Sequence, residues 1–87
     1  MRFDLALSEL RLYTSRSQAN LAIQDGAARL NGQVVKPSHG VRPGDLITLV
    51  GPVGTRSFEV VGLPRPSLSR AAARALLREV PEAGARG

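Results

Sequence analysis

The sequence predicts a single α+β domain: two N-terminal helices packed on a small, mostly antiparallel sheet, with an additional C-terminal helix. Three observations support this. Apolar residues first recur at helical spacing, then short β-branched runs alternate with glycine and proline turns, and finally an alanine-rich segment follows. The chain has 87 residues, of which 43% are hydrophobic, which suffices for one modest core.

The first helix is expected at the N-terminus. Phe3, Leu7 and Leu10 recur at i, i+4 and i+7, which is the spacing of an amphipathic helix. Asp4 falls in its first turn, where a negative charge suits the helix dipole. We therefore interpret Asp4 as a helix-start residue with a local structural role.

A second helix is predicted over residues 16–25. The Ser15 hydroxyl can accept a hydrogen bond from the Gln18 amide while the glutamine side chain reaches back, as in a capping box. Gly26 fits the position just past the helix end, where a left-handed backbone favours a residue without a side chain. Both ends of this helix are thus marked locally.

Turn signals and short apolar runs predict the sheet. Asn31-Gly32 is the dipeptide best suited to a two-residue type I′ hairpin, and it separates Arg29-Leu30 from residues 33–35. Further turns precede the apolar runs at residues 46–50 and 57–61. We therefore expect a hairpin at Asn31-Gly32 and two more strands.

We assign residues 1–62 to one domain with its sheet, and residues 63–87 to a proline-containing linker, a basic helix and a frayed tail. Ser67 or Ser69 can cap this third helix, which is predicted to end near Val80. The domain is thus expected to carry the fold, with the helix as an addition.

The third helix is predicted to carry a basic stripe. Arg70, Arg74 and Arg78 recur every four residues, so they would share one helix face. Such a face is by default a solvated one. The alternative is a contact with a nucleic acid, in which each arginine would release a counterion and steepen the salt dependence.

The charge balance favours a polyanionic partner. Twelve Lys and Arg against seven Asp and Glu give a formal charge of +5, and eleven of the twelve basic residues are arginine. The planar guanidinium fork can hold phosphate bidentately, although a GC-rich genome would also favour arginine codons. Nucleic acid is the leading partner. With three aromatic residues, base stacking is not expected to dominate its binding.

Nothing in the sequence indicates an active site or a bound cofactor. The chain has no cysteine, and its single histidine, His39, lies in a proline and glycine loop. Neither a P-loop nor a dinucleotide fingerprint is present. We therefore expect no catalysis, no metal, no cofactor and no small-molecule substrate.

No segment of the sequence looks like a membrane span or a signal peptide. No apolar run approaches the roughly 18 residues of a span, and the N-terminal residues lack an apolar stretch. We expect a cytoplasmic protein with no membrane partner.

The second helix start is a candidate phosphate site. Its first amides lack partners within the helix and lie at the positive end of the dipole. Arg16 and Asn20 are four residues apart and share a face there. A solvated Arg16 is the competing interpretation, and Asn31-Gly32 is required by the turn whatever the function.

The order and spacing of these motifs resemble the S-four RNA-binding domain, also called the alpha-L motif. The similarity runs over residues 1–50 and lies in these segments: Arg2-Phe3-Asp4, Thr14 to Ala19, Asn31-Gly32, Lys36-Pro37-Ser38 and Gly44-Asp45. The resemblance implies two helices on a small sheet that bind structured RNA. The most similar members are the small stand-alone ribosome-associated heat-shock proteins, whose RNA is that of the large ribosomal subunit.

The resemblance also implies a set of RNA-contacting residues on the helix start, the hairpin and the segment behind it. They are Arg2, Arg11, Thr14, Arg16, Ser17, Asn20, Arg29, Asn31, Gly32, Lys36 and Ser38.

Together, the residues and the resemblance predict a monomeric, non-catalytic protein that binds structured RNA by phosphate and shape contacts. Ribosomal RNA is the expected target, in ribosome quality control or a heat-shock response. One alternative is an accessory module of an RNA-modifying enzyme. Another is a protein-interaction adaptor whose arginines meet an acidic partner.

Overall fold

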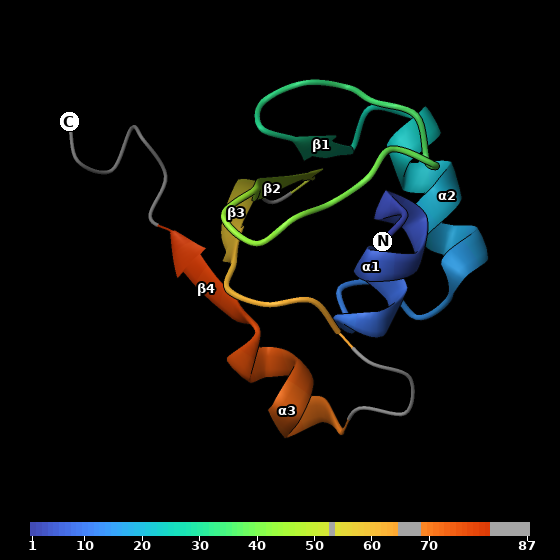
Figure 1. Cartoon of the computed structure of the whole chain (residues 1–87). Coiled ribbons are helices and arrows are strands. Elements are labelled where there is room, and N and C mark those ends of the chain that lie inside the picture. The colour runs from blue at the N-terminus through green and yellow to red at the C-terminus, as the bar shows by residue number, and fades with distance from the viewer. Residues whose placement is uncertain (53, 65–68, 81–87) are drawn as a thin grey trace, which may run out of the picture.

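The computed structural model describes residues 1–52, 54–64 and 69–80, and over these ranges it shows three helices and one four-stranded antiparallel sheet (Figure 1). The α+β prediction is confirmed. The helices are α1 (Phe3–Glu9), α2 (Arg16–Gln24) and α3 (Arg70–Ala75). The strands are β1 (Ala28–Leu30), β2 (Leu46–Gly51), β3 (Gly54–Val60) and β4 (Leu77–Val80), in the spatial order β1-β2-β3-β4.

One aliphatic core joins α1 and α2 to the sheet. Phe3 and Leu7 of α1, Ile23 of α2, Ile47 of β2 and Val60 of β3 are all fully buried within it. Burying each such side chain contributes about 1.5–3 kcal/mol, so this core anchors both helices. None of the helices that the structure describes has the length and apolar character of a membrane span.

The predicted ends of α2 are confirmed. The Ser15 hydroxyl accepts a hydrogen bond of 3.1 Å from the Gln18 amide. Asp25 is the C-cap, and Gly26 follows it with a φ of 78°. Both signals depend on residues within four positions of each other, which is why the sequence reveals them.

The Asn31-Gly32 turn forms as predicted, whereas the strand expected after it does not. Asn31 and Gly32 have φ values of 52° and 80°, and Leu30 and Gln33 exchange both backbone hydrogen bonds. Leu30 and Gln33 form an isolated bridge between β1 and the segment after the turn, and beyond Gln33 the chain leads away from β1. The opposite edge of β1 pairs with β2. The prediction of a strand over residues 33–35 is wrong, because the following loop runs to the start of α1 and hydrogen-bonds there.

The third helix is confirmed but is shorter than predicted. Ser69 caps it by accepting from the Ala72 amide, whereas Ser67 and the predicted frayed tail lie outside the described residues. The helix ends at Ala75, and residues 77–80 form β4 instead of its last turn. Pairing with the otherwise open edge of β3 satisfies the backbone groups of both strands, and this outweighs the local helix preference.

Because α3 ends at Ala75, Arg78 does not lie on the predicted basic helix face. On β4, Arg78 lies opposite Glu59 of β3, and its Nε donates to the Glu59 carboxylate at 3.1 Å. Arg56 of β3 makes a second cross-strand pair, donating to both oxygens of Glu79 at 2.8 and 2.9 Å. Only Arg70 and Arg74 therefore remain on the helix.

A valine at Gly32 tests the hairpin. We expect Gly32→Val to lower the free energy of unfolding by about 2 kcal/mol, because the left-handed φ strains any β-branched residue. Gly40→Val is the matched control. Its Cβ would also meet open space, and its backbone is not left-handed. Urea unfolding followed by circular dichroism measures both, and equal stability of the two variants would contradict the assignment.

Candidate nucleic-acid interface

The interface begins with a loop that caps α1. The first amides of a helix have no partner inside it. Here the Phe3 amide donates to the His39 carbonyl at 2.8 Å, and the Asp4 amide donates to the Pro37 carbonyl at 3.1 Å. These bonds hold Lys36 and Ser38 beside the N-terminus of α1.

The Asp4 side chain lies at the centre of this region. The residue is only 1% exposed, and its carboxylate accepts hydrogen bonds from Arg2 Nε and Nη2, both at 3.1 Å. The Leu5 amide donates to it at 2.7 Å and the Asn20 side-chain amide at 3.3 Å. Arg16 Nε lies 3.5 Å from the same carboxylate. We call Asp4, Arg2, Arg16 and Asn20 the Asp4 cluster.

The Asp4 carboxylate remains ionised although it is buried. Burial by itself raises the pKa of Asp4, but the hydrogen bonds from Arg2, Asn20 and Leu5 and the charge of Arg16 outweigh it. The resulting pKa lies below its usual value. The interior of this surface therefore holds a fixed negative charge between two arginines.

The two arginines of the cluster still face solvent. The Arg2 side chain is 47% exposed and that of Arg16 is 50% exposed. A guanidinium carries five N–H donors, and Asp4 engages two nitrogens of Arg2 and approaches one of Arg16. Each arginine thus presents further donors outward from a fixed position, which is the arrangement that a phosphate oxygen requires.

The Asn20 side chain is engaged within the fold. Arg16 and Asn20 do share a face of α2, as predicted, but the Asn20 amide donates to Asp4 and its oxygen accepts from Gln24. Its side chain is engaged on both sides. We therefore assign Asn20 to holding Asp4 in place.

The hairpin residues are exposed, and two of them support the turn. The Asn31 amide donates to Asp45 at 3.2 Å, and its oxygen accepts from the Leu46 amide at 2.9 Å. Arg29 Nε donates to the Gly26 carbonyl at 3.0 Å. Gly32 lies at the tip with its Cα open to solvent. The hairpin is therefore tied to both α2 and β2.

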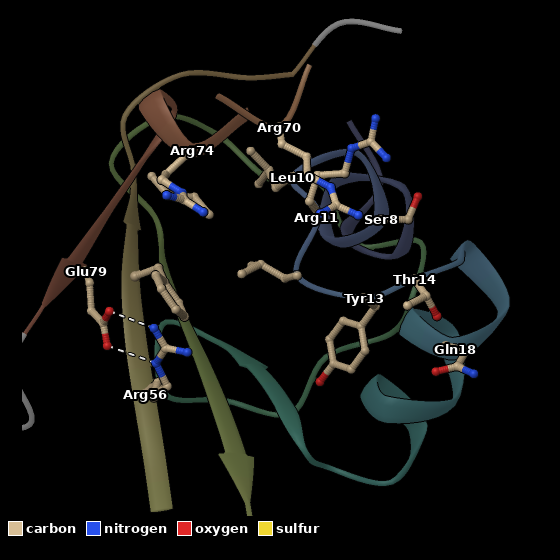
Figure 2. A pocket seen from close by; sticks show the side chains of 13 residues that line it. Ser8, Leu10, Arg11, Tyr13, Thr14, Gln18, Arg56, Arg70, Arg74 and Glu79 are labelled. Atoms are coloured by element: carbon tan, nitrogen blue, oxygen red, sulfur yellow. Dashed lines mark hydrogen bonds and ion pairs between the residues drawn. The ribbon is translucent and has the colours of Figure 1, made fainter. Parts of the chain in front are cut away.

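The predicted contact residues fall into three places. One set is gathered around the start of α1 and consists of Arg2, Arg16, Asn20, Lys36 and Ser38, with Ser17 exposed in the first turn of α2. The hairpin forms the second place. Arg11 and Thr14 lie in the third, a cleft that they share with Arg70 and Arg74 (Figure 2).

Sequence reasoning missed the part that Asp4 plays. An aspartate in a first turn has a sufficient local explanation, and its partner Asn20 is 16 residues away. No spacing rule links the two. Within the described ranges, no three histidine, cysteine or acidic residues come close enough to hold a metal ion.

Neutralising Asp4 tests whether the carboxylate holds the cluster. We expect Asp4→Asn to lower the free energy of unfolding at pH 7 by about 2 kcal/mol, since it removes charge-assisted hydrogen bonds. Because the pKa of Asp4 is lower in the folded state than in the unfolded state, its ionised form stabilises the fold at pH values above the unfolded-state pKa of about 3.9. This stabilisation is lost as the pH falls through the folded-state pKa. Urea unfolding at pH 7 and near pH 3 should therefore show the variant and the wild type converging in acid.

The control for this experiment is Asp25→Asn, which removes the same charge from the exposed C-cap of α2. It should leave the stability at pH 7 within about 0.5 kcal/mol of the wild type. A difference between Asp4→Asn and the wild type that is the same at both pH values would contradict the assignment.

Comparisons with known proteins agree with this geometry. The S4 domain family model matches residues 1–47, a segment that holds the Asp4 cluster, the hairpin and Lys36 to Ser38. The solved structure titled as trimeric heat shock protein 15 of Vibrio cholerae is similar over 99% of this chain and 87% of that chain, with a TM-score of 0.87 and 28% identity. No curated protein matched. Because the family model covers more than half of the 87 residues, the chain belongs to the S4 domain family.

Proposed function

We propose that the chain is a non-catalytic RNA-binding protein and that Arg2 and Arg16 of the Asp4 cluster, with Lys36 and Ser38, contact phosphates of a folded RNA. One observation carries the proposal. A buried, ionised carboxylate fixes two arginines that remain half exposed.

Fixing the arginines in advance favours binding. A long side chain that is immobilised on binding loses about 0.5–1.5 kcal/mol of rotamer entropy. Arg2 and Arg16 have already lost part of this freedom to Asp4. The start of α2 adds amides and a positive dipole end next to Arg16. The surface is thus prepared for an anion before the anion arrives.

Folded RNA fits this surface better than single bases do. Arg2, Arg16, Lys36 and Ser38 offer charged and polar donors, and none of them is aromatic. Helical RNA hides most base edges in a deep groove, so proteins read it by shape and by backbone and 2′-hydroxyl contacts. The hairpin, which projects from β1, would provide the shape.

The proposed target is ribosomal RNA of the large subunit, in ribosome quality control or a heat-shock response in the cytoplasm. This part rests on the resemblance to the stand-alone heat-shock members, which the similarity to heat shock protein 15 over nearly the whole chain supports. We propose a monomer. Since the similar structure is titled as trimeric, sedimentation of this protein alone and with RNA is the direct check.

Removing single phosphate contacts tests the proposed surface. Arg16→Ala and Lys36→Ala should each weaken binding to a large-subunit ribosomal RNA stem-loop with a blunt end. Each should also lower the slope of log affinity against log salt by about one. Fluorescence anisotropy at several salt concentrations measures both quantities. Unchanged affinity and slope in both variants would refute the surface.

Arg78→Ala is the matched control for charge. It removes one positive charge from β4, where Arg78 pairs with Glu59 away from the Asp4 cluster. Its affinity and salt slope should stay close to the wild type. An equal loss in all three variants would mean that only net charge matters, and the phosphate surface would not be specific. An unrelated stem-loop run in parallel tests the ribosomal part of the proposal.

A further inference from the structure

A cleft of about 930 Å³ opens on a part of the molecule that the Asp4 cluster does not reach. It lies between the end of α1, the α1–α2 connection, α3 and the strands β3 and β4 (Figure 2). None of the four cluster residues lines it, nor do Lys36 and Ser38. The cleft depends on the C-terminal segment, since α3 and β4 supply part of its wall.

The cleft is strongly basic. Its described lining includes four arginines and one glutamate, a net formal charge of +3: Arg11, Arg56, Arg70, Arg74 and Glu79. The single acid is already neutralised, because both Glu79 oxygens accept from Arg56. Among the lining residues that the structure describes, no acid remains to balance the positive charges of Arg70 and Arg74.

Arg70 and Arg74 are the arginines that most need a ligand. Both extend from α3 into the cleft and are exposed (Figure 2). Among the residues that the structure describes, neither has an ion-pair partner. They are four apart on a six-residue helix, where like charges repel and weaken the helix slightly. A bound anion would remove this repulsion.

Two of the three aromatic side chains of the chain also line the cleft. The Phe58 ring is covered by the Arg56 guanidinium, 5.1 Å from its centroid. Tyr13 is half-buried and projects from the α1–α2 connection into the space before the sheet (Figure 2). Burial raises the pKa of Tyr13, so its hydroxyl stays a donor at neutral pH. Thr14 and Gln18 add further polar groups beside it.

Proteins that bind single-stranded nucleic acid combine arginines with aromatic side chains. The arginines contact the phosphates, and the bases stack on the aromatic rings. The volume is within the roughly 300–1,000 Å³ of ligand pockets, which suits a few nucleotides. A duplex keeps its bases stacked and cannot offer a base face to a recessed ring. An acidic peptide would satisfy the arginines but would leave the ring unused.

We propose that this cleft binds a short single-stranded RNA segment, with Arg70 and Arg74 on its phosphates and Tyr13 against an unpaired base. This segment would adjoin the folded RNA held by the Asp4 cluster, an arrangement that rests on the proposed function. The protein would thus read a junction between paired and unpaired RNA.

Two RNA probes separate the cleft from the Asp4 cluster. One is the blunt stem-loop, and the other is the same stem-loop with a 3′ tail of a few uridines. The wild type should bind the tailed probe about tenfold more tightly, because the tail adds base stacking on Tyr13 and a phosphate contact. Arg74→Ala should lose most of this advantage and bind the blunt probe as the wild type does.

Arg42→Ala is the matched control, because Arg42 is exposed and lines neither the cleft nor the Asp4 cluster. It should keep the advantage of the tail. Tyr13→Leu should lose that advantage and Tyr13→Phe should keep it, since phenylalanine retains the ring. A circular dichroism melt of each variant shows whether it is folded.

The tyrosine also gives a direct signal. Tyr13 is the only tyrosine and the chain has no tryptophan, so its fluorescence reports on this cleft alone. Oligouridylate should quench it saturably, and less so in Arg74→Ala. Quenching by an oligoglutamate peptide but not by oligouridylate would overturn the proposal in favour of an acidic protein segment.

The results also distinguish the two proposals from each other. An equal tail advantage in the wild type and Arg74→Ala would overturn the cleft and leave the Asp4 cluster standing. Unchanged binding of the blunt probe by both Arg16→Ala and Lys36→Ala would refute the proposed phosphate surface, whereas saturable quenching by oligouridylate would still support the cleft.

Discussion

The buried carboxylate of Asp4 is the interaction on which the candidate surface depends. It joins the chain before α1, through Arg2, to the first turns of α2, through Arg16 and Asn20. The Phe3 and Asp4 amides at the start of α1 donate hydrogen bonds to the loop that carries Lys36 and Ser38. A buried charge is costly unless it is paired and hydrogen-bonded, and here its partners are the groups proposed to meet RNA. Under the proposed function, stability and binding would share the same side chains.

Other polar residues of this region serve the fold. Ser15 caps α2, and Asn31 ties the hairpin to β2, so their polar groups are occupied within the fold. Arg16 and Lys36 keep exposed charge on the surface that these contacts shape. The C-terminal segment adds a second region, because β4 completes the sheet while α3 carries Arg70 and Arg74 to the cleft at the end of α1 (Figure 2). Paired and unpaired parts of one RNA would then meet different residues.

Most of the fold could be predicted because its signals are local. The caps of α2 and the Asn31-Gly32 turn each depend on a few adjacent residues, and all of them formed. The strand β4 could not be predicted in this way. Leu77 to Val80 continue an alanine- and arginine-rich run that favours a helix, and only the open edge of β3, about 20 residues earlier, makes them a strand. The roles of Asp4 and of the Tyr13 cleft were hidden for the same reason, since their partners are distant in sequence.

A double-mutant cycle between Asp4 and Arg16 tests the central claim most directly. The affinity for the blunt RNA stem-loop is measured for the wild type, Asp4→Asn, Arg16→Ala and the double variant, at pH 7 and at a temperature where circular dichroism shows all four folded. If Asp4 positions Arg16 for a phosphate, Arg16→Ala should cost less in the Asp4→Asn background, with a coupling energy of about 0.5–3 kcal/mol. Additive effects would contradict the account, because Arg16 would then bind RNA without help from the buried carboxylate.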